Sequence, residues 1–143
     1  MKNQSITQID IANFELKWGV ALPEDYKRFL LNNSQDSLRE KSFDIQAGES
    51  LDSSVIQDFF RLKAEPYRKL DFYLNSSTGR IPSGFVPVAN DVFGNLILLS
   101  TGDERIYFWD HEQEDLDPSQ AMTLLSFNFS EFLQSLRDIK PDE

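Results

Sequence analysis

Residues 85–109 read FVPVANDVFGNLILLSTGDERIYFW, and this stretch decides which kind of fold the chain can adopt. It contains three short apolar segments separated by turn-forming residues: Phe85–Ala89, Leu96–Ser100 and Arg105–Trp109. Short apolar segments of this kind, bounded by turns, are typical of β-strands. Leu96–Ser100 is apolar at successive positions, as in a strand covered on both faces. Pro87 cannot donate a ladder hydrogen bond, so the first strand is expected at a sheet edge or at a bulge.

Two helices are predicted before this region. The first runs over Thr7–Trp18, with an apolar stripe at helical spacing, and Gly19 stands where a helix C-cap glycine would. The second begins at Leu22–Pro23, because proline is favoured at the first helical position. It ends at Asn32–Ser34. The expected buried residues of the two helices are Ile11, Phe14, Trp18, Tyr26, Phe29 and Leu30.

The middle of the chain is less uniform. Ser42–Ala47 alternates apolar and polar residues and is predicted to be a short strand. The pattern of Val55–Leu62 fits a helix or a strand, and periodicity alone cannot decide such a short segment. Pro66 is expected to open a third helix with one apolar side: Tyr67, Leu70 and Leu74.

A last helix is predicted after Asn128, which has capping-box spacing to Glu131. Its apolar side is Phe132, Leu133 and Leu136. Together these elements predict an α+β fold, with a central, mainly antiparallel sheet flanked by helices.

The composition excludes several classes of protein. The chain has 143 residues, one histidine, no cysteine and a formal net charge of −10. The length predicts a single domain over residues 1–143. Without cysteine there is no disulfide framework and no thiolate nucleophile. The acidic excess argues against direct nucleic-acid binding, which needs clustered Lys and Arg, and favours a basic partner. No signal peptide and no apolar stretch of roughly 20 residues is present, so we expect a cytoplasmic protein away from membranes.

Enzyme chemistry would have to use His111, or a pair of carboxylates. His111 lies among Asp110, Glu112 and Glu114, which could join it as metal ligands, but the spacing matches neither H-E-x-x-H nor the calcium-loop motif. A solvated acidic loop explains the same residues. No G-x-S-x-G serine elbow and no phosphate-binding glycine loop occurs. A carboxylate pair for glycoside hydrolysis stays open, because a sequence does not give the separation of two carboxylates. We expect no catalytic residue, metal or cofactor.

The charge is unevenly distributed. Residues 103–117 hold seven acidic residues and one basic residue, a net charge of −6, whereas residues 61–80 carry +3. The simple interpretation is a solvated loop that keeps the protein soluble. The functional interpretation is an acidic docking surface, whose potential accelerates association with a basic protein.

Four blocks of residues, in order, span nearly the whole chain. The first is Phe14–Leu30, with Gly19, Leu22-Pro23 and Asp25-Tyr26, and the second is Ile81–Leu98, with Pro82, Gly84-Phe85, Pro87-Val88-Ala89, Asp91 and Gly94-Asn95. The third is Ile106–Glu112, and the fourth is Ser126–Leu133, with Phe127 and Glu131-Phe132. Together they resemble the SUKH superfamily, whose fungal members are the Smi/Knr cell-wall-synthesis regulators. One departure is Asn32-Asn33-Ser34, where the family often has an Asn-Gly turn; asparagine tolerates the left-handed conformation such a turn needs. Another is the insertion-like Phe127–Phe129.

The resemblance implies an α+β fold, favours Val55–Leu62 as a strand and implies function without catalysis. Many bacterial members resemble immunity proteins that bind and neutralise a toxin, often a nuclease, of a polymorphic toxin system. The alternative is a regulatory or scaffold protein related to the cell-wall (glucan) synthesis regulators. On the immunity hypothesis, acidic residues imitate the polyanion that a nuclease binds. Asp91 has a rival role, capping its own turn. The expected partner-binding residues are Asp91, Asp103, Glu104, Tyr107, Asp110, His111, Glu112, Glu114 and Asp115.

Overall fold

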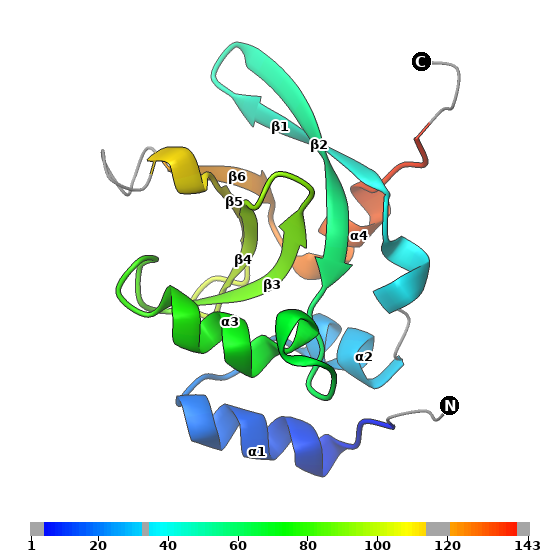
Figure 1. Ribbon diagram of the computed structural model, residues 1–143, viewed down its shortest axis with the longest axis vertical. Coiled ribbons are helices and arrows are strands. Elements are labelled where there is room, and N and C mark those ends of the chain that lie inside the picture. Colours follow the sequence, from blue (N-terminus) through cyan, green and yellow to red (C-terminus); the bar gives the residue numbers. More distant parts are fainter. Residues whose placement is uncertain (1–4, 33–34, 114–120, 140–143) are drawn as a thin grey trace.

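The computed structural model describes residues 5–32, 35–113 and 121–139. Those ranges contain four α-helices, six strands and three short 3-10 helices (Figure 1). The α-helices are α1 (Gln8–Trp18), α2 (Glu24–Asn32), α3 (Leu70–Ser77) and α4 (Phe129–Ser135). The strands are β1 (Ser42–Ala47), β2 (Ser50–Phe59), β3 (Phe85–Asp91), β4 (Leu96–Ser100), β5 (Ile106–Trp109) and β6 (Met122–Ser126). The 3-10 helices are η1 (Gln35–Leu38), η2 (Pro66–Arg68) and η3 (His111–Gln113).

The six strands form one antiparallel sheet in the order β1-β2-β3-β4-β5-β6, so each strand pairs with its neighbours along the chain. This arrangement confirms the predicted α+β class. The sheet curves until β1 and β6 contact one another, and Ser42 of β1 bridges to Arg137, which follows α4. The sequence predicted Ser42–Ala47 with the observed bounds and did not predict β6.

The central strands explain how the sheet accommodates its proline. β3 lies between β2 and β4, so the expectation of an edge strand was wrong and that of a bulge is confirmed. The register shifts between Pro87 and Ala89, and this irregularity accommodates a residue without an N–H inside the sheet. Every residue of β4 is buried, as its sequence predicted. Val55–Leu62 is largely strand, because β2 reaches Phe59.

The N-terminal helices form close to their predicted bounds, but α2 begins at Glu24, just after Pro23, and Trp18 is half-buried where burial was expected. Thr7 and Asp10 make a capping box at the start of α1, and Gly19 ends the helix with φ +65°. α2 buries its three predicted residues. The third helix begins later than predicted, at Leu70 rather than Pro66, and Tyr67 is 56% exposed. The cause is a bridge to Arg61: its N–H donates to the Arg68 carbonyl and its carbonyl accepts from the Leu70 N–H, which holds Lys69 extended.

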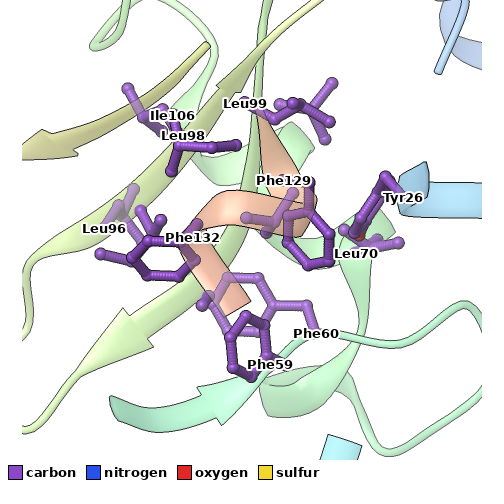
Figure 2. Packing of buried hydrophobic residues seen from close by; sticks show 14 of the residues in the cluster. Tyr26, Phe59, Phe60, Leu70, Leu96, Leu98, Leu99, Ile106, Phe129 and Phe132 are labelled. Atoms are coloured by element: carbon purple, nitrogen blue, oxygen red, sulfur yellow. The ribbon is translucent and has the colours of Figure 1, made fainter. Parts of the chain in front are cut away.

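Two phenylalanines of α4 occupy the centre of the core (Figure 2). The Phe129 ring lies 4.9 Å from that of Tyr26 and 5.0 Å from that of Phe29, both on α2. The Phe132 ring lies 5.9 Å from Phe43 of β1. Since edge-to-face aromatic pairs add to the free energy of burial, α4 joins α2 to the sheet. Its predicted cap is confirmed: the Asn128 side chain accepts from the Glu131 N–H at 2.8 Å.

Candidate protein-binding surface

The sheet divides the acidic segment of the sequence into two surfaces. Leu99 pairs with Ile106 and Leu96 with Trp109, so Asp103 and Glu104 lie beyond one end of β5 and residues 110–112 beyond the other. At about 3.4 Å per strand residue, β5 alone separates them by roughly 10 Å. Glu114 and Asp115 lie outside the described residues. A partner would therefore meet two acidic surfaces rather than one continuous loop.

The first surface is the β4–β5 turn. The Asp103 carboxylate accepts a hydrogen bond from the Arg105 backbone N–H at 3.1 Å, which holds the pKa of Asp103 below its usual value. The Arg105 guanidinium lies 3.8 Å from the same carboxylate and covers the exposed Phe127 ring. Glu104 is exposed in the left-handed conformation, with φ +70°. On β5, half-buried Tyr107 packs edge-on against Phe85.

The second surface is a hollow of about 370 Å³ at the opposite end of the sheet. It lies where the β1–β2 hairpin, which projects beyond the other strands in Figure 1, meets the β3–β4 turn and the ends of β5 and β6. We call it the acidic hollow, and its lining includes Ile45, Asp52, Asp91, Phe93, Phe108 and Asp110.

Asp91 forms the floor of the acidic hollow and is almost completely buried. One carboxylate oxygen accepts from the backbone N–H groups of Phe93 and Asn95, at 2.9 and 2.8 Å. The other accepts from the Ser54 hydroxyl at 2.8 Å and from the Asn95 side-chain amide at 3.1 Å. These four hydrogen bonds tie β2 to the β3–β4 turn, the capping role that the sequence offered as the alternative for Asp91.

The same network positions His111. The Asn95 amide nitrogen donates to Asp91, so its oxygen faces His111 and accepts from the His111 backbone N–H at 3.1 Å. The His111 ring Nδ1 lies 3.1 Å from that oxygen, and the pattern assigns a proton to Nδ1. A side chain on Gly94, which has φ +89°, would meet the His111 ring at 3.7 Å. His111, the first residue of η3, is thus held against the β3–β4 turn.

Two carboxylates and one aromatic ring surround the opening of the acidic hollow. Asp52 is exposed and Asp110 half-buried, and among the residues that the structure describes neither has a basic side chain within 4 Å. The Asp110 side chain accepts from the backbone N–H of exposed Glu112 at 3.0 Å. Phe93 is 69% exposed. Unneutralised carboxylates beside an exposed aromatic ring suit a basic protein surface.

Sequence reasoning missed Asp52 and Phe93. Asp52 comes from a distant strand and reaches the acidic hollow only because it pairs with Ile45 in the β1–β2 hairpin. No local pattern marks it. Phe93 did carry a signal, since a large apolar residue beside Gly94 in a turn between two strands has little chance of burial.

Two other classes of site have no counterpart in the described ranges. No three His, Asp or Glu side chains there gather closely enough to hold a metal ion. None of the helices in those ranges has the length and apolar character needed to cross a bilayer.

Comparison with known proteins places this geometry in context. The model of the SMI1/KNR4 family (SUKH-1) matches residues 5–135. The SPbeta prophage-derived uncharacterized protein YokK of Bacillus subtilis (strain 168) is 27% identical to this chain over an alignment of 147 residues. The alignment spans 92% of this chain and 75% of that protein.

Proposed function

This chain belongs to the SMI1/KNR4 family (SUKH-1), and from that premise we propose that it is a non-enzymatic immunity protein, which binds and neutralises a basic toxin domain in the cytoplasm. The prophage origin of its relative fits a gene that travels with mobile elements, where a toxin and its antidote stay together. A nuclease is a suitable toxin, because its active-site surface must be positive to bind nucleic acid.

The acidic hollow is the observation that carries this proposal. The carboxylates at its opening, Asp52 and Asp110, can pair with Lys or Arg side chains of the toxin, and long-range attraction between opposite charges raises the association rate. Phe93 supplies the aromatic anchor that charges alone do not, since a few buried aromatic and Arg residues dominate the energy of most interfaces. Together they favour a convex basic partner that inserts a side chain into the hollow.

Within this proposal the predicted residues take different roles. Asp110, His111 and Glu112 contact the partner beside Asp52 and Phe93. Asp91 is a positioning residue, which keeps the β3–β4 turn and His111 rigid so that little conformational entropy is lost on binding. Asp103, Glu104 and Tyr107, at or near the β4–β5 turn, form a second contact region away from the acidic hollow. Glu114 and Asp115 remain proposed contacts from the sequence.

The test begins with capture of the partner on the purified protein, by co-expression with the products of its neighbouring genes. Association rates are then measured at low and high salt for the double variant Asp52→Asn/Asp110→Asn. We expect a several-fold lower rate at low salt and a shallower salt dependence. The matched control is Asp44→Asn. Asp44 is an acidic residue of β1 whose carboxylate is already paired with Arg137.

Phe93→Ala tests the anchor separately. We expect the dissociation rate to rise about tenfold or more, with little change in the association rate. If the double variant and Phe93→Ala both bind like the control, the acidic hollow is not the interface. A partner without toxic activity would instead favour the alternative, a regulatory or scaffold protein related to the cell-wall synthesis regulators.

We further propose that residues 1–143 fold as one domain. This is supported by a hydrophobic cluster that includes Ile11 near one end and Phe132 near the other. Urea unfolding should show one transition with the same midpoint by far-UV circular dichroism and by tryptophan fluorescence. Separate midpoints would indicate more than one unit.

A further inference from the structure

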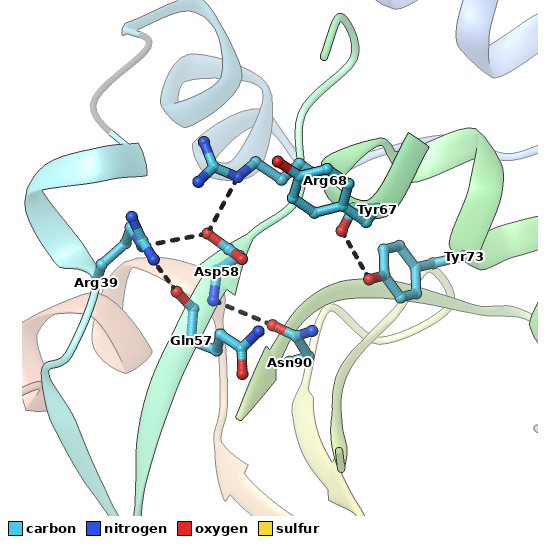
Figure 3. Close-up of polar contacts among 7 residues, drawn as sticks. All are labelled: Arg39, Gln57, Asp58, Tyr67, Arg68, Tyr73 and Asn90. Atoms are coloured by element: carbon cyan, nitrogen blue, oxygen red, sulfur yellow. Dashed lines mark hydrogen bonds and ion pairs between the residues drawn. The ribbon is translucent and has the colours of Figure 1, made fainter. Parts of the chain in front are cut away.

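A cluster of charged residues lies at the opposite end of β2 from the acidic hollow (Figure 3). Its centre is Asp58, which is 6% exposed. The β2–β3 register shifts between Ile56 and Asp58, and the Asn90 side chain accepts from the Asp58 N–H at 3.0 Å. Bulges of this kind redirect a side chain, and here the carboxylate turns toward arginines of two other segments.

Two arginines converge on the same oxygen of Asp58. Arg39 follows η1 and places its Nε 3.3 Å from Asp58 Oδ1, while it also donates to the Gln57 carbonyl at 3.1 Å. Arg68 ends η2 and places its Nε 3.7 Å from the same oxygen. The two Nε atoms therefore lie no more than about 7 Å apart. Figure 3 shows the Asp58 carboxylate between the two arginines, with the contacts made through Nε.

The backbone holds both arginines in place. The residue after Arg39, Glu40, donates its N–H to the Ile56 carbonyl at 2.9 Å. The Arg68 carbonyl accepts from the Arg61 N–H at 2.8 Å. These bonds fix the backbone on which each arginine stands, and the ion pairs to Asp58 orient the two side chains.

The cluster contains more positive charge and more donors than Asp58 can satisfy. Two guanidinium groups face one carboxylate, which leaves a local charge of +1. The Nε of Arg68 is buried and makes no hydrogen bond, because 3.7 Å is too long for one. Among the described residues, the terminal nitrogens of Arg39 and Arg68 make no hydrogen bond, and neither guanidinium group has an acidic partner besides Asp58. Their side chains are 42% and 24% exposed, so solutes can reach them.

From this arrangement we propose that Arg39 and Arg68 form a binding site for a phosphoryl group. A guanidinium fork binds oxyanions through parallel N–H donors. Two forks that approach from different segments can both be paired by a phosphoryl group, which offers three or more oxygens in a tetrahedral arrangement, whereas a planar carboxylate offers two. The exposed ring of Tyr67, whose centre lies 5.6 Å from the Arg68 guanidinium carbon, forms one wall. Asp58 aligns both forks and limits their attraction for the anion.

The first experiment measures binding of inorganic phosphate to the intact protein by isothermal titration calorimetry, with sodium chloride adjusted to keep ionic strength constant. Wild type should bind phosphate saturably, with a stoichiometry of one, and should not bind acetate. Arg39→Gln and Arg68→Gln should each weaken binding about tenfold or more, as expected for the loss of a charge-assisted hydrogen bond. Arg137→Gln is the matched control, since that guanidinium is already paired with Asp44 at 2.8 and 3.2 Å.

Asp58→Asn separates an anion site from a purely structural ion-pair cluster. It removes the opposing charge, so phosphate should bind several-fold more tightly than to wild type, whereas a structural cluster would lose stability and gain no affinity. If this variant does not fold, the two single arginine variants decide the question. Absence of saturable binding in wild type, or equal affinity in Arg39→Gln, Arg68→Gln and Arg137→Gln, would overturn the proposal.

The source of the phosphoryl group is settled by a second titration. Phenyl phosphate should bind more tightly than inorganic phosphate if the natural ligand is an aromatic phosphate ester that stacks on Tyr67, and Tyr67→Ala should remove the difference. Equal affinities, unchanged in Tyr67→Ala, would assign free phosphate as the ligand.

Discussion

Replacing Asp91 by alanine should be among the most destabilising single changes near the acidic hollow. The substitution removes the acceptor of four hydrogen bonds, at 2.8–3.1 Å. The Phe93 N–H lies beside an exposed residue and can bond to water instead. Ser54 and Asn95 are 5% and 9% exposed, so their donors would stay buried and unpaired. These are three donors, the Ser54 hydroxyl and the backbone and side-chain N–H groups of Asn95. At about 1–3 kcal/mol for each, the free energy of unfolding should fall by about 3–9 kcal/mol.

Asp91→Asn refines the reasoning. The asparagine keeps one oxygen for the two backbone N–H groups of the turn, but its amide nitrogen would face the amide nitrogen of Asn95. One hydrogen bond is therefore lost where alanine loses all four, and the cost should be about 1–3 kcal/mol. Asp52→Ala, an exposed position two residues from Ser54, should change stability by less than about 0.5 kcal/mol.

Urea denaturation followed by the fluorescence of Trp18 and Trp109 measures all three variants. Equal m-values would show that the variants unfold over the same change in exposed surface, so that differences in midpoint report stability. A loss below about 1 kcal/mol in Asp91→Ala, or a loss in Asp91→Asn as large as in Asp91→Ala, would refute the account of Asp91 as the acceptor that organises the turn.

Three further outcomes follow from single positions. Burial raises the pKa of Tyr26, and its hydroxyl has no hydrogen-bond partner among the described residues. Tyr26→Phe should therefore raise the urea midpoint by an amount equivalent to about 1 kcal/mol. A lower midpoint would reveal a partner for the hydroxyl. Gly94→Ala should lower the free energy of unfolding by about 1–2 kcal/mol in the same assay, because φ is +89° at this position. The new methyl group should contact the His111 ring and shift its imidazole NMR signals. Unchanged signals would contradict that contact. The Thr7 backbone N–H lowers the pKa of Asp10 below its ordinary value of 3.8, so the stability that this carboxylate contributes is complete above that value and is lost as pH falls through the folded-state pKa. A carboxyl NMR titration that gives a pKa at or above 3.8 for Asp10 would count against that hydrogen bond.

Local chemistry made part of this fold predictable. Thr7, Gly19 and Asn128 mark helix ends because their side chains or backbone preferences act within a few residues. β6 escaped prediction since Met122–Ser126 has no alternating pattern, and none of its residues is fully buried. The late start of α3 also escaped, because it depends on a backbone bridge to Arg61, several residues away, rather than on the helix sequence.

The candidate sites were predictable only in part, for a related reason. The acidic residues at 103–112 are visible in the sequence, but the β4–β5 hairpin that divides them is a property of the sheet. Asp52 lines the same hollow as Asp110 only because the β1–β2 hairpin brings it there. Arg39, Asp58 and Arg68 stand in three separate segments, and no spacing rule connects them. Long-range convergence of this kind needs the three-dimensional structure.

The position of α4 in the core also has a consequence for biosynthesis. Phe129 and Phe132 fill the space between α2, β1 and β2, yet they are translated after every strand of the sheet that they cover. Until these residues leave the ribosome, the apolar residues of the sheet that they cover in the folded protein lack that cover. Surface of that kind promotes aggregation and recruits chaperones. A chain that is released without α4 would therefore lack the cover of this apolar face and would be prone to aggregate.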